Sequence, residues 1–140
     1  MSETIHVDIV SAEGEIFSGA AKMVFLPAAE GEIGVAPRHA PLLTLLKAGE
    51  VRVQPVEGPE QSFYVGGGAL EVQPSRVTVL ADTAARARDL DEAAALAARQ
   101  RAEEALAGKI DKLEQAEALA ELARAAAQLK LIERLRKMKG

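Results

Sequence analysis

Apolar and polar side chains alternate with a period of two at the start of the chain, which is typical of strands with one face on a core. Ile5, Val7 and Ile9 alternate with His6 and Asp8 in this way. Shorter apolar runs predict eight further strands, at 15–17, 22–26, 33–35, 42–46, 50–54, 62–65, 69–72 and 76–81. Many short strands at regular spacing form sandwiches or barrels, so we expect a β-sandwich.

Glycine and proline separate these runs. Turns are expected at Glu13-Gly14, Ser18-Gly19, Glu30-Gly31, Ala48-Gly49, 57–59 and 73–75. The glycine-rich segment 65–72 matches neither the dinucleotide-binding pattern nor the phosphate-binding loop, and it lies between strands rather than before a helix. This segment therefore predicts a bend or a bulge.

The last third of the chain has the pattern of two helices. Asp89 with Glu92 forms a capping-box pattern, and Asp111 with Glu114 repeats it. We expect a first helix to about residue 107, ended by Gly108, which can adopt positive φ, and a second to about residue 137. The apolar stripe of the second helix is expected at Leu119, Leu122, Ala126, Leu129 and Ile132.

Composition divides the chain at the same place. All six prolines precede residue 83, and residues 84–140 contain eighteen alanines. Residues 1–84 carry a net charge of −6 and residues 85–140 a net charge of +2. The sequence thus predicts a β + α fold: an N-terminal antiparallel β-sandwich domain (1–84), then a C-terminal antiparallel two-helix hairpin domain (85–140). Because alanine buries little area, we expect a marginally stable hairpin that can detach or open.

Few residues suggest chemistry. The chain has no cysteine and only two histidines, so no metal site is expected. A net charge of −4 argues against nucleic-acid binding. The acidic turns around Glu30 and Glu32 are expected to face water or a partner, and His39 to hold the backbone or dock a partner rather than act as a base.

Several segments together resemble the epsilon-subunit family of F-type ATP synthases, the subunit called delta in mitochondria. They occur in one collinear order over nearly the whole chain: 8–13, 16–19, Glu30-Gly31-Glu32-Ile33-Gly34, His39-Ala40-Pro41-Leu42-Leu43, 67–74, 77–83 and 123–132. The resemblance implies a non-catalytic rotor subunit of the central stalk. Its partners would be the gamma subunit, the c-subunit ring and the alpha/beta catalytic subunits. It would reach the cytoplasmic face of the bacterial inner membrane only through the complex.

The resemblance also assigns contact residues. Those toward the c-ring and gamma would be Glu30, Gly31, Glu32, His39, Ala40, Pro41 and Leu42. Arg38 stands where many relatives have glycine, so its turn needs a conformation that arginine adopts only at a cost. In bacterial members the hairpin extends beside gamma and inhibits ATP hydrolysis.

Basic residues of the hairpin would then meet the catalytic head: Arg124, Lys130, Arg134, Arg136 and Lys137. Cations near the end of a helix also suit its dipole, and that simpler explanation stays open.

Some relatives bind ATP on the folded hairpin through a motif that opens its first helix. Asp91 of that motif is present, and Arg101 and Arg124 match two further basic positions. Ala94 stands at the arginine position, and Gln128 replaces a third basic residue. Since arginine is the bidentate phosphate partner, we expect weak ATP binding or none, and no cofactor.

Two other classes of function remain as alternatives. A chaperone-like or adaptor module would grip a partner with its hairpin, and copurification with gamma and the catalytic head would argue against it. An enzyme using the acidic loops would lose its turnover when Glu30 and Glu32 are both replaced by alanine.

Overall fold

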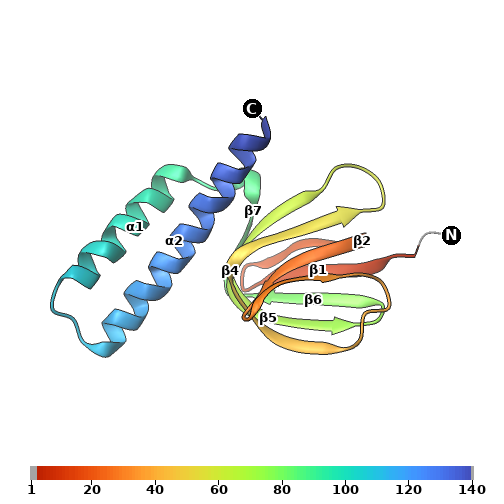
Figure 1. Ribbon diagram of the computed structural model, residues 1–140, viewed down its shortest axis with the longest axis horizontal. Coiled ribbons are helices and arrows are strands. Elements are labelled where there is room, and N and C mark those ends of the chain that lie inside the picture. The colour runs from red at the N-terminus through yellow and green to blue at the C-terminus, as the bar shows by residue number, and fades with distance from the viewer. Residues whose placement is uncertain (1–2, 140) are drawn as a thin grey trace. The chain divides into compact units, whose positions relative to one another are not determined.

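The computed structural model describes residues 3–139 and divides into two compact units, the first ending at Ala87 and the second beginning at Arg88. The first unit contains seven strands and the second two α-helices. Figure 1 draws the first helix in blue-green and the second in blue. The last strand, β7 (Ala84–Arg86), pairs with β5 (Gln61–Gln73), so the first unit continues past residue 84.

The strands of the first unit form one sheet that closes on itself. They are β1 (Ile5–Ser11), β2 (Gly14–Ala28), β3 (Gly31–Val35), β4 (Leu42–Pro55), β5 (Gln61–Gln73), β6 (Arg76–Ala81) and β7 (Ala84–Arg86). The order is β1-β6-β5-β4-β2-β3, and β1 also pairs with β2. All pairings are antiparallel except β1 with β6, which run parallel. The expected sandwich followed by two helices is confirmed.

The core of the sandwich lies inside this closed sheet. The alternating residues Ile5, Val7 and Ile9 are fully buried, as the period of two predicts. They pack with inward side chains of the other strands, among them Leu26, Val51, Phe63, Leu70 and Val79. His6 and Asp8 therefore lie on the outer face of β1.

Three predicted strand pairs are in fact single long strands, and this is a correction. The runs 15–17 and 22–26 both belong to β2, 42–46 and 50–54 to β4, and 62–65 and 69–72 to β5. Gly19 lies opposite Val7 and Gly49 opposite Val65 inside ladders rather than in turns. Gly49 makes room for a neighbouring strand, because a Cβ there would lie 2.7 Å from Pro27 Cβ.

The glycine-rich segment bends β5 at the point where its pairing changes from β7 to β6, which confirms the predicted bend. Gly67 and Gly68 have φ of 104° and 139°. The Gly66 amide donates to Thr83 O at 2.8 Å and Gly67 O accepts from the Asp82 amide at 2.9 Å, where β6 gives way to β7. A Cβ on Gly68 would lie 2.1 Å from Leu80 O. These glycines shape the backbone, and no helix follows them.

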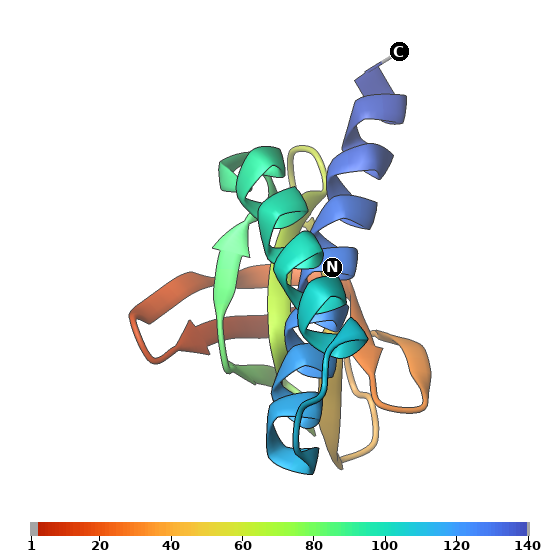
Figure 2. The same ribbon diagram turned by 90° about the vertical axis from the view of Figure 1, so that its left-hand side faces the viewer.

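The second unit is the predicted helical hairpin, with α1 at Glu92–Ala107 and α2 at Lys112–Lys139 (Figure 2). A 3-10 turn, Ala87–Asp89, precedes α1. The cap of α1 is Asp91, whose Oδ1 accepts from the Ala94 amide at 3.2 Å, and not Asp89, which lies in that turn. Asp111 caps α2 as expected, accepting from the Glu114 amide at 2.7 Å. Gly108 ends α1 as expected, at φ −92°, so the positive φ that is open to glycine is not used there.

Small residues form the contact between the two helices. The buried positions are Ala95 and Ala102 on α1 and Ala118, Ala125 and Leu131 on α2. The predicted stripe of α2 is only partly correct. Leu122, Leu129 and Ile132 are half-buried, but Leu119 is 50 % exposed and Ala126 is also exposed. Four of the five residues in the predicted stripe are leucine or isoleucine. The helices instead bury alanines seven residues apart, and two turns of helix return each to the same face.

Candidate functional site

The predicted acidic turn joins β2 to β3 and leaves its carboxylates on the surface. Gly31 has φ of 141°, a conformation that favours glycine, and the Ala29 amide donates to Leu45 O at 2.9 Å. Glu30 and Glu32 are both exposed. The turn therefore lies beside the first half of β4.

Glu32 is already paired within the chain. Its Oε1 accepts from Arg52 at 3.0 Å, and the other terminal nitrogen of Arg52 meets Glu60 at 3.5 Å. The guanidinium also lies 4.4 Å above the centre of the Phe25 ring. Sequence analysis missed Arg52, because its partners are 20 and 8 residues away and only the strand register brings them together.

The second predicted loop, which carries His39, precedes β4. Arg38 has φ of 69°, so arginine occupies the left-handed conformation that this turn was expected to need. Its amide donates to Pro74 O at 2.8 Å, and its guanidinium pairs with Glu3. His39 Nδ1 donates to Ala40 O at 2.7 Å, which matches the expected backbone-holding histidine. Ala40, Pro41 and Leu42 are exposed, so the two loops flank the segment 42–46 of β4.

Exposed leucines extend from this segment across the outer face of the sandwich. Leu43 is 76 % exposed, Leu45 66 % and Leu80 55 %. Leu45 lies opposite Ala69, which in turn lies opposite Leu80, so Leu45 and Leu80 share a face. We call Leu43, Leu45 and Leu80 the leucine row. The sequence predicts a strand at 42–46, and its four leucines in five positions were the signal that apolar side chains would face water.

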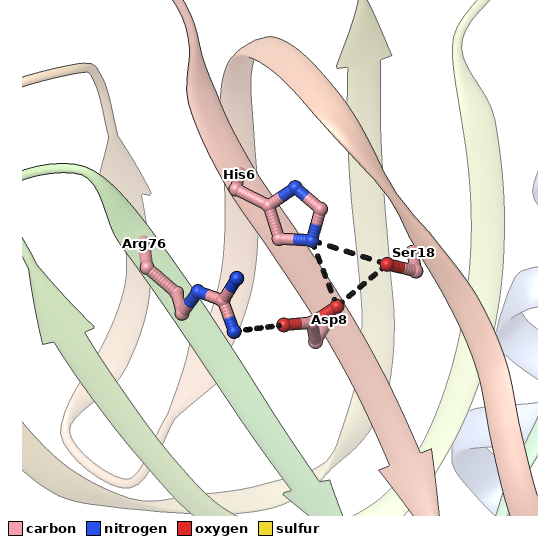
Figure 3. A network of polar contacts seen from close by, with 4 residues as sticks. All are labelled: His6, Asp8, Ser18 and Arg76. Atoms are coloured by element: carbon pink, nitrogen blue, oxygen red, sulfur yellow. Dashed lines mark hydrogen bonds and ion pairs between the residues drawn. The ribbon is translucent and has the colours of Figure 1, made fainter.

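A polar network occupies the same outer face, nearer the start of β1 (Figure 3). Ser18 Oγ donates to Asp8 Oδ1 at 2.7 Å, and Arg76 meets Asp8 Oδ2 at 3.1 Å. His6 Nε2 lies 2.9 Å from Asp8 Oδ1 and 3.1 Å from Ser18 Oγ. A nucleophilic triad needs the acid and the serine on opposite ring nitrogens, whereas here both meet Nε2. The network joins three strands and does not activate Ser18.

The network also controls the ionisation of Asp8. Burial raises the pKa of Asp8, but the hydrogen bonds from Ser18 and His6 and the charges of His6 and Arg76 outweigh burial. The pKa of this carboxyl is therefore held below its ordinary value. Asp8 is a charged anchor between β1, β2 and β6.

The basic residues predicted to meet a partner lie along α2, where Arg136 and Lys137 have acidic neighbours. Arg136 donates to Glu92 of α1 at 3.0 Å, and Lys137 lies 3.4 Å from Glu133 one turn earlier. Arg134 donates to Met138 Sδ at 3.0 Å. Lys130 is exposed and Arg124 half-buried. In this hairpin, Arg136 is engaged between the helices.

The three residues of the weak ATP site are not gathered. Asp91 caps α1 with its carboxylate, while Arg101 donates to Glu121 of α2 at 3.2 Å. Arg124 lies one turn beyond Glu121. Arg101 lies ten positions after Asp91, which is about 15 Å along the helix axis. Weak ATP binding or none stays a prediction.

Within residues 3–139 no group of three or more His, Asp or Glu side chains could hold a metal ion. The same residues include no helix that is both long and apolar enough to span a bilayer. The features that the surface does offer are exposed leucines, acidic turns and basic helix residues, which are means of binding other proteins. The fold and its surface thus define a protein-docking module built from a β-sandwich and a helical hairpin.

Two family models cover nearly the whole chain. The ATP synthase delta/epsilon chain β-sandwich domain matches residues 4–87, and the delta/epsilon chain long α-helix domain matches residues 88–133. The chain belongs to the delta/epsilon family of ATP synthase subunits, which confirms the resemblance. The family is a non-catalytic one.

Two curated relatives match this chain over all or nearly all of their length. The ATP synthase epsilon chain of Nitrosococcus oceani is 66 % identical over 140 residues, covering 100 % of both chains. That of Alkalilimnicola ehrlichii is 64 % identical over 134 residues, covering 96 % of each.

Two solved structures have the same fold at low sequence identity. A chain of the Euglena gracilis mitochondrial ATP synthase matches with a TM-score of 0.70 and 18 % identity, covering 98 % of this chain and 82 % of that one. A chain of the Tetrahymena thermophila mitochondrial ATP synthase, from its central stalk and c-ring, matches with a TM-score of 0.68 and 11 % identity, covering 94 % and 98 %.

Proposed function

We propose that this chain is the epsilon subunit of a proton-translocating F-type ATP synthase and turns with the central stalk. Its sandwich connects gamma with the c-subunit ring, and so couples rotation of the ring to the alpha/beta catalytic head. Family membership supports this assignment, as does the shared fold with a chain from the Tetrahymena central stalk and c-ring. The chain itself performs no chemistry in this role.

The leucine row is the observation that carries the proposal. Monomeric soluble proteins rarely leave large apolar patches open to water, and such patches mark docking surfaces. Leu43, Leu45 and Leu80 are each more than half exposed. In the proposed assembly gamma covers this face. The loops at 30–32 and 39–42 flank the same strand and meet the c-ring.

A charge placed in the row tests this docking surface. We expect Leu45→Glu to reduce retention of the chain on a gamma-containing catalytic head, because the carboxylate would be buried without a partner. The matched control is Leu119→Glu, since Leu119 is 50 % exposed on α2. Equal retention of the Leu45→Glu and Leu119→Glu variants would refute the docking surface.

The hairpin is proposed to inhibit ATP hydrolysis when it extends along gamma toward the catalytic head. Its contacts are alanines and exposed ion pairs, so an alternative packing costs little. Deleting residues 88–140 should raise ATP hydrolysis by the assembled complex. Unchanged hydrolysis would show that this chain does not use its hairpin as an inhibitor.

The proposed assembly also fixes the location. ATP synthase is membrane-associated, and this chain reaches the membrane through the complex. We place it on the cytoplasmic face of the bacterial inner membrane, as its bacterial relatives suggest. We expect the chain to be released from washed membranes together with the catalytic head, and not with the integral proteins.

A further inference from the structure

Four segments of the sandwich meet at the guanidinium of Arg52. Phe25 comes from β2, Glu32 from β3, Arg52 from β4, and Glu60 from the residue before β5. The two terminal nitrogens of Arg52 meet Glu32 at 3.0 Å and Glu60 at 3.5 Å, while its central carbon lies 4.4 Å above the Phe25 ring. We call these four residues the Arg52 cluster.

The aromatic base of the cluster is itself held in place. Phe25 lies opposite Gly34 of β3 on one side and opposite Arg52 of β4 on the other. A Cβ on Gly34 would lie 3.1 Å from Phe25 Cε1, so only glycine lets the ring lie across β3 without a shift. The ring then supports the planar guanidinium from below. The ring therefore orients Arg52 independently of the two carboxylates.

The ion pair with Glu32 matters more for orientation than for stability. The Glu32 side chain is 55 % exposed and that of Arg52 26 %. Exposed pairs add little to stability because water screens them and side-chain entropy opposes them. A carboxylate that is already fixed, however, loses less freedom when a partner binds. The pair uses Glu32 Oε1, and the second oxygen of a carboxylate can accept from a partner's amide or cationic donor.

We propose that Arg52 is a positioning residue, which fixes the carboxylate of Glu32 for its contact with a hydrogen-bond-donating loop of the c-ring. The inference rests on the proposed function, because it takes the ring as the partner of the β2–β3 turn. Glu60 holds the opposite side of the guanidinium and is distant from that turn in sequence. Arg52 reaches the ring only through Glu32.

The test compares binding to two preparations. One is membranes with the complete synthase depleted of this chain, and the other is the soluble catalytic head with gamma but without the ring. The dissociation constant for the head without the ring, divided by that for the complete synthase, measures how much affinity the ring adds. We expect Arg52→Gln and Glu32→Gln each to reduce this ratio about fivefold, the most that such an exposed pair ordinarily supplies. The double variant should reduce the ratio no further than either single variant does.

Two further variants separate positioning from general damage. Glu60→Gln should keep the full ratio, because the Arg52–Glu32 contact remains. Arg52→Lys should recover part of it, since a flexible ammonium holds Glu32 less firmly. A loss of affinity for both preparations alike on Arg52→Gln would mean structural damage and would overturn the inference.

The remaining outcomes distinguish the inference from the proposed function. If Glu32→Gln lowers the ratio and Arg52→Gln does not, Arg52 is not a positioning residue and the ring contact stands. If the unaltered chain binds both preparations equally, the ring adds nothing, and the ring contact in the proposed function fails together with this inference.

Discussion

The sandwich and the hairpin are stabilised by different means. The sandwich buries Ile, Val, Leu and Phe side chains inside a closed sheet, whereas the hairpin buries four alanines and one leucine. Burial contributes about 25 cal/mol per Å² of apolar surface, so each buried alanine contributes far less than a buried Phe or Ile. Two ion pairs, Arg101–Glu121 and Arg136–Glu92, add to the hairpin. The difference predicts that the hairpin opens at a lower free-energy cost than the sandwich.

The chain allows the two units to be followed separately. Its only tyrosine, Tyr64, is buried in the sandwich, and there is no tryptophan. Both α-helices lie in the hairpin. The near-ultraviolet signal of Tyr64 therefore reports the sandwich, and the far-ultraviolet signal at the helix band reports the hairpin.

The largest expected effect is on the core of the sandwich. Phe63 is 1 % exposed, and its ring centre lies 5.3 Å from that of Phe17. Phe63→Ala should lower the free energy of unfolding of the sandwich by about 3–5 kcal/mol. Urea unfolding followed at Tyr64 measures this loss. If the helical signal shifts by the same amount, the two units unfold as one and the comparison fails.

A substitution that enlarges a side chain should have the next largest effect, and it should act on the hairpin. Ala102 is 1 % exposed on α1, so Ala102→Leu forces the helices apart at a cost of about 1–3 kcal/mol. The helical signal should melt earlier while the Tyr64 signal stays. Ala97→Leu is the matched control, because Ala97 is exposed and leucine is nearly as good a helix former. Equal effects of both changes would show that the alanine contact does not hold the helices.

The sequence predicts the kinds of element here better than their extents. Period-two alternation and the alanine-rich end identify strands and helices, because both patterns act within one segment. Ser18-Gly19 and Ala48-Gly49 resemble turns locally, yet Gly49 is needed because Pro27 of another strand lies against it. The buried face of α2 likewise depends on how closely α1 approaches, so the large residues did not mark it.

The candidate site divides in the same way. The loops at 30–32 and 39–42 can be located from the sequence, and the resemblance also points to the left-handed conformation of Arg38. The pairing of Arg52 with Glu32 cannot be predicted, because it depends on the register of β3 and β4 against β2. The network of His6, Asp8, Ser18 and Arg76 depends in turn on a parallel pairing of β1 with β6 that no local pattern signals.

The polar network makes the stability of the sandwich depend on the ionisation of Asp8. The pKa of Asp8 is lowered in the folded chain, so its contribution to stability is present above the ordinary carboxyl pKa of about 4. It is lost as the pH falls from there through the folded pKa. We expect Asp8→Asn to cost about 1–2 kcal/mol near neutral pH and to flatten the decline below pH of about 4.

The control for Asp8 lies on the same face of the sheet. Glu71 is exposed and lies opposite Thr78, which lies opposite Asp8. Glu71→Gln removes a carboxylate of the same charge without touching the network. Acid unfolding followed at Tyr64 should retain the steep decline in that variant. An equally steep decline in Asp8→Asn would assign the acid sensitivity to other carboxyls.

The smallest expected effect concerns the ion pair between Glu92 and Arg136, 3.0 Å apart. Glu92 lies in the first turn of α1, where a carboxylate also interacts with the helix dipole. The loss of stability in Glu92→Gln alone would therefore be larger than the contribution of the ion pair. A double-mutant cycle with Arg136→Gln isolates the coupling, which we expect at about 0.2–1 kcal/mol in the melting of the helical signal. The coupling should shrink in 1 M salt, where charges are screened within about 3 Å. A coupling of zero at low salt would leave the alanine contact to hold the hairpin without this pair, and Arg136 would then be available to a partner at no cost.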